Sequence, residues 1–185
     1  MSNQNEVIFG IDLGTTYSCI AYVDEYSRPV VISNRDNKPT TPSVVYFEGE
    51  NRVVGDEAKN MALVEPDKVV EMAKRHMGDP NWRFFCDNNE YRAEEISSYI
   101  LSKLAKDAEE RLNIPVKDVV ITCPAYFGMN ERDATMRAGQ IAGLNVRELL
   151  NEPTAAAVNY GLQTEQGQVV LVYDLGGGTF DTTVI

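Results

Sequence analysis

The 185-residue chain is 43% hydrophobic and 24% charged, which is typical of a globular protein, and its formal net charge is −11. This negative charge argues against nucleic acid as a partner. No apolar run approaches the ~20 residues that span a membrane. The N-terminus lacks the pattern of a secretory signal. With one histidine and three widely spaced cysteines, a disulfide framework or a histidine-based zinc site is disfavoured, and we expect a cytoplasmic protein with reduced thiols.

The first half of the chain is predicted to begin with extended segments and to continue with helices. Apolar and β-branched stretches predict strands over 6–14, 17–24 and 29–34, and a hairpin over 44–55. Helical patterning follows over 56–66 and 66–78. The clearest helix spans 93–112, where apolar residues recur at every fourth position: Ile96, Ile100, Leu104, Ala108 and Leu112. The Met and aromatic side chains in the middle of the chain are typical of core or loop packing: Met72, Met77, Trp82, Phe84 and Phe85.

Strands and helices alternate in the second half. The predicted order is a strand over 116–124, a helix over 130–143 with Asn130 as its N-cap, a strand over 145–150, a helix over 153–161, and strands over 168–175 and 179–185. The predicted order, in which strands come first, helices follow and the two then alternate, indicates a mixed α/β fold.

One short pattern occurs twice. "IDLGTTYS" (11–18) and "YDLGGGTFDTT" (173–183) both follow a strand with Asp-Leu-Gly and a turn rich in Gly and Thr, and their aspartates, Asp12 and Asp174, are 162 positions apart. That spacing is too long for a solenoid repeat and favours a duplicated domain. The second copy has barely begun where the sequence stops, so we expect half of a two-lobed protein.

Both turns have the chemistry of a phosphate site. Glycine lets backbone N–H groups approach a ligand closely, and consecutive N–H groups form an anion-binding nest. Neither turn is followed by the lysine of a P-loop, and a carboxylate stands beside each instead, so a polyphosphate there needs a bridging cation such as Mg²⁺. A plain structural hairpin explains either turn taken singly; the shared Asp before Leu favours the functional interpretation.

With "AKRHMG", "CPAYF" and "NEPTAAAVNYG" added to the two hairpins, the chain resembles the 70-kilodalton heat-shock chaperone family of the DnaK type, from about Val7 to Ile185. The resemblance implies an α/β fold of the actin-like ATPase superfamily, with a ribonuclease-H-like core of mixed β-sheet flanked by helices. The core of lobe I is then expected at 1–41 and 117–185, with a smaller inserted α+β subdomain at 42–116. Lobe II and the peptide-binding domain lie outside the sequence.

The resemblance also implies a role for each matching residue. Asp12 and Asp174 orient Mg²⁺, and Asp181 helps to bind a potassium ion. The phosphates of ATP or ADP are held by two sets of residues: Gly14, Thr15, Thr16 and Tyr17, and Gly176, Gly177, Gly178 and Thr179. Lys74 reaches the γ-phosphate and Glu152 positions the attacking water, which places them with Asp174 among the catalytic residues. Pro124 and Arg132 carry the signal between the ATP and peptide sites.

The family activity is that of a chaperone and stress-response protein that couples ATP hydrolysis to the binding and release of unfolded, apolar peptide segments. The expected partners are a J-domain co-chaperone and a nucleotide-exchange factor, with no role for nucleic acid or membrane. An actin-like filament protein and a sugar or acetate kinase share the hairpin core and remain alternatives. A third alternative is that the 185 residues fold as an inactive lobe, because hydrolysis needs both lobes to close around the nucleotide.

Overall fold

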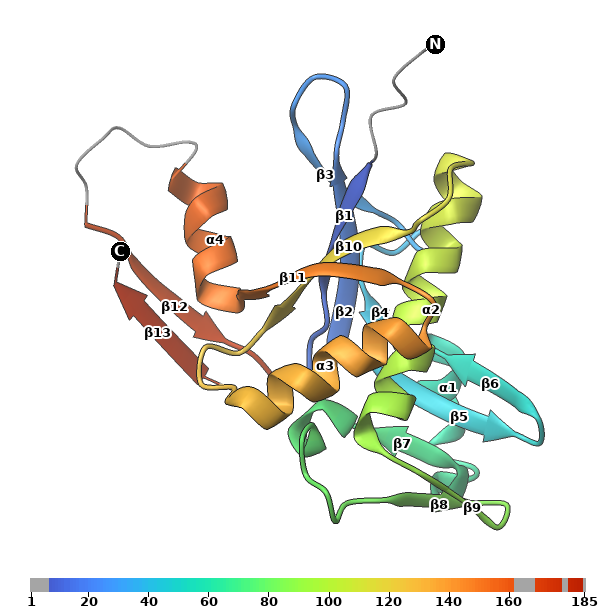
Figure 1. The fold of residues 1–185 in the computed structure, drawn as a ribbon. Helices are drawn as coiled ribbons and strands as arrows, with labels where there is room; N and C mark the ends of the chain where they lie inside the picture. The colour runs from blue at the N-terminus through green and yellow to red at the C-terminus, as the bar shows by residue number, and fades with distance from the viewer. Residues whose placement is uncertain (1–6, 162–168, 178–179, 185) are drawn as a thin grey trace.

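The computed structural model describes residues 7–161, 169–177 and 180–184, and a mixed β-sheet forms its centre (Figure 1). The strand order is β11-β10-β1-β2-β3, with β4 paired to β2. Strands β1, β10 and β11 are parallel, whereas β2 runs antiparallel to β1, β3 and β4. The strands are β1 (Ile8–Asp12), β2 (Tyr17–Val23), β3 (Pro29–Ile32), β4 (Thr41–Pro42), β10 (Asp118–Cys123) and β11 (Asn145–Asn151). This α/β architecture confirms the predicted fold class.

One face of the sheet is covered by α2 (Ala93–Leu112) and α3 (Met129–Ile141), which pack against each other. The apolar stripe of α2 lies in the core as predicted: Ile96, Ile100, Leu104 and Ala108 are all buried. They belong to the same core cluster as Phe9 and Ile121 of the sheet. Helix α3 begins at Met129 with Gly128 as its N-cap and no side-chain cap, so the prediction of Asn130 as the N-cap was wrong.

A second, smaller sheet follows the first four strands and has the order β6-β5-β7. It consists of β5 (Val44–Glu48), β6 (Asn51–Val54) and β7 (Val69–Glu71), and the short helix α1 (Asp56–Met61) packs on it. A two-stranded ribbon, β8 (Phe84–Cys86) with β9 (Asn89–Tyr91), leads into α2. Of the Met and aromatic residues predicted to pack, Met77, Trp82 and Phe84 join the core, whereas Phe85 is exposed.

The predicted helix over 66–78 was wrong. This stretch forms the 3₁₀ turn η1 (Pro66–Lys68), strand β7, and the 3₁₀ turn η2 (Ala73–His76). Val69 and Val70 are buried and pair with Tyr46 and Val45 of β5. A branched Val-Val pair is suited to a strand, and Met72 then adopts the left-handed conformation, with φ of 56°, which ends it. Tertiary pairing therefore overrides the helical pattern.

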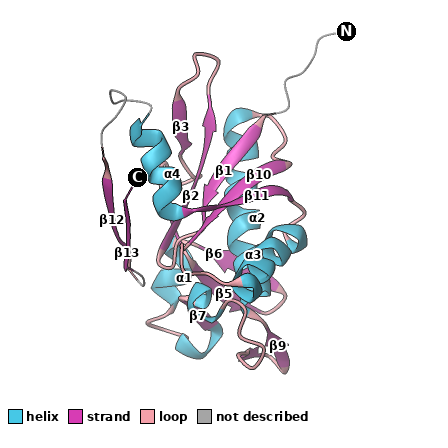
Figure 2. Ribbon diagram, turned by 60° about the vertical axis from the view of Figure 1, so that its left-hand side comes forward, coloured by secondary structure: helices cyan, strands magenta, loops and turns pink. Residues whose placement is uncertain are grey.

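Helix α4 (Glu152–Gly161) begins directly after β11 and lies between the central sheet and a C-terminal hairpin, as the two views agree (Figures 1 and 2). The hairpin pairs β12 (Leu171–Leu175) with β13 (Phe180–Val184), and its register sets Asp174 opposite Asp181. No helix in the described ranges is both long and apolar enough to cross a membrane.

Candidate functional site

Two buried serines stabilise the turn between β1 and β2 through hydrogen bonds. The Ser43 hydroxyl donates to the Gly14 carbonyl at 2.8 Å, and the Gly14 N–H donates to the Ser18 Oγ at 3.1 Å. The two Oγ atoms lie 2.9 Å apart, so Ser18 donates to Ser43 and the ring of hydrogen bonds closes. A closed buried network of this kind rigidifies the turn before any ligand arrives.

The two glycine turns that the sequence separates by 162 positions meet in space. A Cβ atom added to Gly177 would lie 2.5 Å from Cγ2 and 2.6 Å from Oγ1 of Thr16. Only glycine permits this approach, because a methyl group would occupy the space of the threonine side chain. The two turns of the predicted repeat are therefore in contact, and they form opposite walls of one site.

A cavity of about 670 Å³ lies at this junction. Its charged lining residues come from four different elements: Asp12, Lys74, Glu152 and Asp174. The turns contribute Gly14, Thr15, Thr16, Tyr17, Gly176 and Gly177. The fold thus brings together most of the residues that the sequence nominated for the nucleotide.

Lys74 and Glu152 form a buried ion pair in the wall of the cavity. The Lys74 Nζ and Glu152 Oε1 atoms lie 2.5 Å apart, and the side chains are only 7% and 13% exposed. Lys74 comes from η2 and lies 6.0 Å from the centroid of the Phe127 ring, while Glu152 is the first residue of α4. The cavity therefore holds a fixed cation beside a fixed carboxylate.

Burial raises the pKa of Glu152 above its usual range. The ion pair with Lys74 opposes this effect, whereas the negative charges of Asp12 and Asp174 add to it. A carboxyl group with a raised pKa holds a proton more readily, and ionises at a cost to the folded state. Its environment is the kind found around groups that move protons or position water.

We expect the free energy of unfolding to depend on pH because the pKa of Glu152 is raised. Because the folded pKa lies above the unfolded one, the Glu152 contribution to stability falls as pH rises through the interval between them. The variant Glu152→Gln lacks this component. In urea titrations between pH 4 and 8, the difference in unfolding free energy between Glu152→Gln and the parent should shift in favour of the variant as pH rises. Loss of the Lys74 bond adds an offset that is the same at every pH, so only the change of the difference with pH tests the pKa. If the difference is the same at every pH, the raised pKa is contradicted.

The charge in the cavity suits a cation-bridged polyphosphate. Three carboxylates face one lysine among the lining residues, so the cavity has an excess of negative charge. A phosphate chain entering it meets N–H and hydroxyl donors from the turns, but also carboxylates that repel it. Asp12 and Asp174 are the residues that fit Mg²⁺, which binds one or two carboxylates and otherwise waters and phosphate oxygens.

Comparison with known proteins identifies the family. The family model described as "Hsp70 protein" matches residues 8–84 and 81–185. This chain belongs to the Hsp70 family. Among its curated relatives is the protein named Chaperone protein DnaK in two strains of Halobacterium salinarum, each 48% identical over 181 residues. That alignment covers 98% of this chain and 29% of each relative, so the chain spans less than a third of their length.

Thr122 is a cavity residue of this Hsp70 chain that the sequence analysis missed. It faces Asp12 across the parallel pair of β10 and β1, and its hydroxyl donates to the Asp12 Oδ1 atom at 2.8 Å. This bond orients the carboxylate and leaves Oδ2 for another partner. A lone threonine in a buried strand carries no signal in the sequence.

Pro124 and Arg132, the predicted signalling residues, do not line the cavity between the two glycine turns of the Hsp70 chain but lie beside it. The Pro124 carbonyl accepts a bond from the Phe127 N–H. Arg132 donates to the Phe127 carbonyl at 3.1 Å and to the Asn151 side chain at 2.5 Å. Asn151 directly precedes Glu152, so Arg132 ties α3 to the point where α4 and its carboxylate begin.

Three predicted site residues do not enter the description of the cavity. Gly178 and Thr179 lie outside the described residues. Asp181 is described through the backbone of β13 alone.

Proposed function

We propose that this chain is the ATP-binding part of a molecular chaperone that couples ATP hydrolysis to the binding and release of unfolded polypeptide. The observation that carries the proposal is the convergence of both glycine turns, Asp12, Asp174 and the Lys74–Glu152 pair on one cavity. Membership of the Hsp70 family favours this function over an actin-like filament protein or a small-molecule kinase.

The residues of the cavity have different roles in phosphoryl transfer. The N–H and hydroxyl groups of residues 14–17 and 176–179 hold the phosphates, and Lys74 offers its positive charge to the terminal one. Glu152, whose pKa is raised, accepts a hydrogen bond from the attacking water and orients it. Mg²⁺ bound near Asp12 and Asp174 supplies charge neutralisation at the phosphate oxygens, and Asp181 assists a potassium ion.

We propose that the chain divides into two parts, each of which contains one of the two larger sheets. Residues 1–41 and 117–185 are proposed as the ribonuclease-H-like core of lobe I, which carries the central sheet. Residues 42–116 are proposed as the inserted subdomain, which includes the β6-β5-β7 sheet and supplies Lys74 to the cavity.

The partners follow from the family. Apolar peptide segments bind to parts of the protein outside this chain, and a J-domain co-chaperone and a nucleotide-exchange factor regulate it in the cytoplasm. Pro124 and Arg132 transmit the state of the cavity, because Arg132 contacts the residue next to Glu152.

The test is the melting temperature of the chain with Mg-ADP, with ADP and a chelator, and with neither. A ligand at about 100 times its dissociation constant adds ~2.7 kcal/mol to the stability of the folded state. We expect a magnesium-dependent rise that Asp12→Asn abolishes. Thr122→Val, which keeps the carboxylate but removes its hydrogen bond, should retain a smaller rise. An equal rise in the presence of chelator, or in Asp12→Asn, contradicts the proposed magnesium site.

A further inference from the structure

The turn that carries Lys74, η2, is held in place by contacts outside the cavity between the glycine turns. The Lys74 carbonyl accepts a bond from the Met77 N–H at 3.2 Å. Met77 is 4% exposed and belongs to the core, where the Ser97 hydroxyl of α2 donates to its Sδ atom at 3.7 Å. Helix α2 is therefore one support of the turn.

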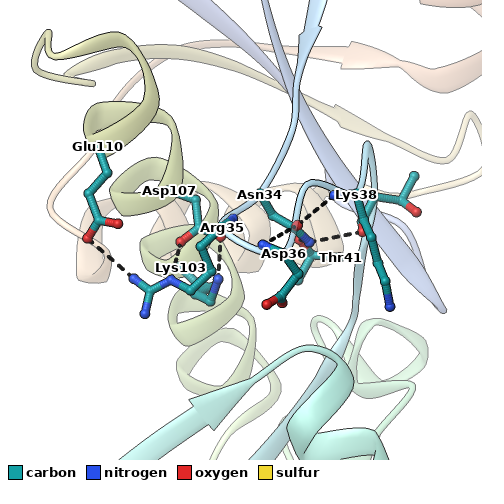
Figure 3. Close-up of polar contacts among 9 residues, drawn as sticks. Asn34, Arg35, Asp36, Lys38, Thr41, Lys103, Asp107 and Glu110 are labelled. Carbon is teal, nitrogen blue, oxygen red and sulfur yellow. Dashed lines mark hydrogen bonds and ion pairs between the residues drawn. The ribbon is translucent and has the colours of Figure 1, made fainter.

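Helix α2 is itself fixed to the central sheet by buried polar contacts at its other end (Figure 3). Asp107 is 3% exposed and accepts bonds from Lys103 of the same helix and from the Arg35 Nε at 3.1 Å. Arg35 lies in the loop after β3, where the buried Asn34 donates from Nδ2 to the Thr41 Oγ1 at 3.1 Å. Because a shift of α2 would break these buried bonds, the helix provides a rigid support.

Gly78 packs against the first turn of α3. Its φ angle is 78°, and a Cβ atom added to it would lie 2.8 Å from the Glu131 N atom and 2.9 Å from the Asn130 carbonyl carbon. Both are backbone atoms and cannot rotate away, so only glycine permits this approach. The contact lies four residues after Lys74 and fixes the end of η2 against α3.

A ring stack adds a further contact to the same segment. The centroids of the His76 and Trp82 rings lie 4.6 Å apart, and the ring planes are inclined by 8°. Trp82 packs against the core cluster. The stack therefore joins His76, which is two residues after Lys74, to the core.

The first turn of α3 also supports the partner of Lys74. Arg132 follows Glu131 and donates to the Asn151 Oδ1 at 2.5 Å, and Asn151 directly precedes Glu152. The two members of the ion pair are 78 positions apart in the chain. Both are nevertheless placed relative to one helical turn.

We propose that Gly78 and the His76–Trp82 stack position Lys74 against Glu152, with the first turn of α3 as their common support. This proposal rests on the proposed function, in which Lys74 meets the terminal phosphate. None of the three residues lines the cavity, so they are positioning residues and not catalytic ones. A buried ion pair requires close geometry, and a displacement of about 1 Å at a catalytic group can lower a rate ~100-fold.

The test is the coupling energy between Lys74 and Glu152 in the 185-residue chain. A double-mutant cycle of Lys74→Met and Glu152→Gln, followed by urea titration at neutral pH, measures it. The cycle is repeated with Gly78→Ala and with Gly143→Ala in every member. Gly143 is the matched control, because its φ angle of 81° gives alanine the same left-handed strain while its added Cβ meets nothing within 4 Å.

We expect Gly78→Ala to reduce the coupling energy by at least half and Gly143→Ala to leave it unchanged. Both variants lower the stability of the chain, whereas only a change in the position of Lys74 alters the coupling. If Gly78→Ala does not fold, Trp82→Leu decides, because it removes the stack without adding an atom to a tight contact. It should reduce the coupling, and Phe85→Leu, which replaces an exposed aromatic residue three positions further on, should not.

Several results overturn the proposal. They are the absence of coupling in the parent chain, unchanged coupling in Gly78→Ala or in Trp82→Leu, and an equal reduction in either variant and its control. The titrations contain no nucleotide. A failure of Mg-ADP to bind therefore contradicts the proposed function and leaves this outcome unaffected.

Discussion

Replacing Lys74 with methionine is expected to lower the free energy of unfolding by about 3 kcal/mol at neutral pH, since removing one partner leaves the other as an uncompensated buried charge. The Glu152 side chain is 13% exposed, and burial, with a smaller contribution from the charges of Asp12 and Asp174, already raises its pKa. Without Lys74, Glu152 either remains ionised in an unfavourable environment or takes up a proton. The loss of stability should therefore shrink as pH falls and Glu152 becomes neutral in both states.

Urea denaturation followed by circular dichroism at several pH values measures this effect. The double variant Lys74→Met/Glu152→Gln should recover most of the loss at neutral pH, because it removes both charges together. Lys117→Met provides the baseline for an exposed lysine, within about 0.5 kcal/mol of the parent. If Lys74→Met costs no more than Lys117→Met, or if the double variant is the least stable of the set, the buried pair does not exist in solution.

Replacing Gly14 with alanine is expected to be comparably damaging, for a steric reason. The added Cβ would lie 2.0 Å from the backbone oxygen of Tyr17. Backbone cannot rotate away as a side chain can, so the turn between β1 and β2 must distort, at a cost of about 3 kcal/mol. The Ser18 and Ser43 bonds to Gly14 would distort with it, and the magnesium-dependent stabilisation by ADP should be lost.

Gly10, in strand β1 just before the turn that contains Gly14, provides the matched control. A Cβ at Gly10 meets nothing within 4 Å. Alanine in a strand interior avoids the entropic cost of glycine, so Gly10→Ala should match the parent or exceed its stability by up to about 1 kcal/mol. Thermal melts of both variants, with and without Mg-ADP, make the comparison. Equal behaviour of the two variants would show that the tight approach at Gly14 is not maintained.

Local pattern was sufficient for elements whose neighbours along the chain determine them. The four-residue apolar period of α2 predicted a core helix, and Pro153 with an Ala-rich run predicted α4 after Glu152. Residues 66–78 had a helical pattern as well, yet β5 recruited Val69 and Val70 into a sheet. Sequence reasoning errs there because the pairing partner lies more than 20 positions away.

The same contrast holds for the candidate site. Taken locally, Lys74 resembles a solvated lysine on a charged helix, and only the family resemblance singled it out. The structure buries it in a 3₁₀ turn opposite Glu152, which is 78 positions away. Ser43 and Thr122 support the site through contacts 29 and 110 positions long. Isolated hydroxyl residues have no local pattern from which such contacts can be inferred.

The sequence by itself determined the repeated Asp-Leu-Gly turns, the mixed α/β class and the family, because these depend on residue types and spacing along the chain. Only the tertiary structure decided that Gly177 packs against Thr16 and that Lys74 pairs with Glu152. The physical reason is that burial and charge pairing depend on distances in space. Those distances are set by which strands pair and which helices cover them.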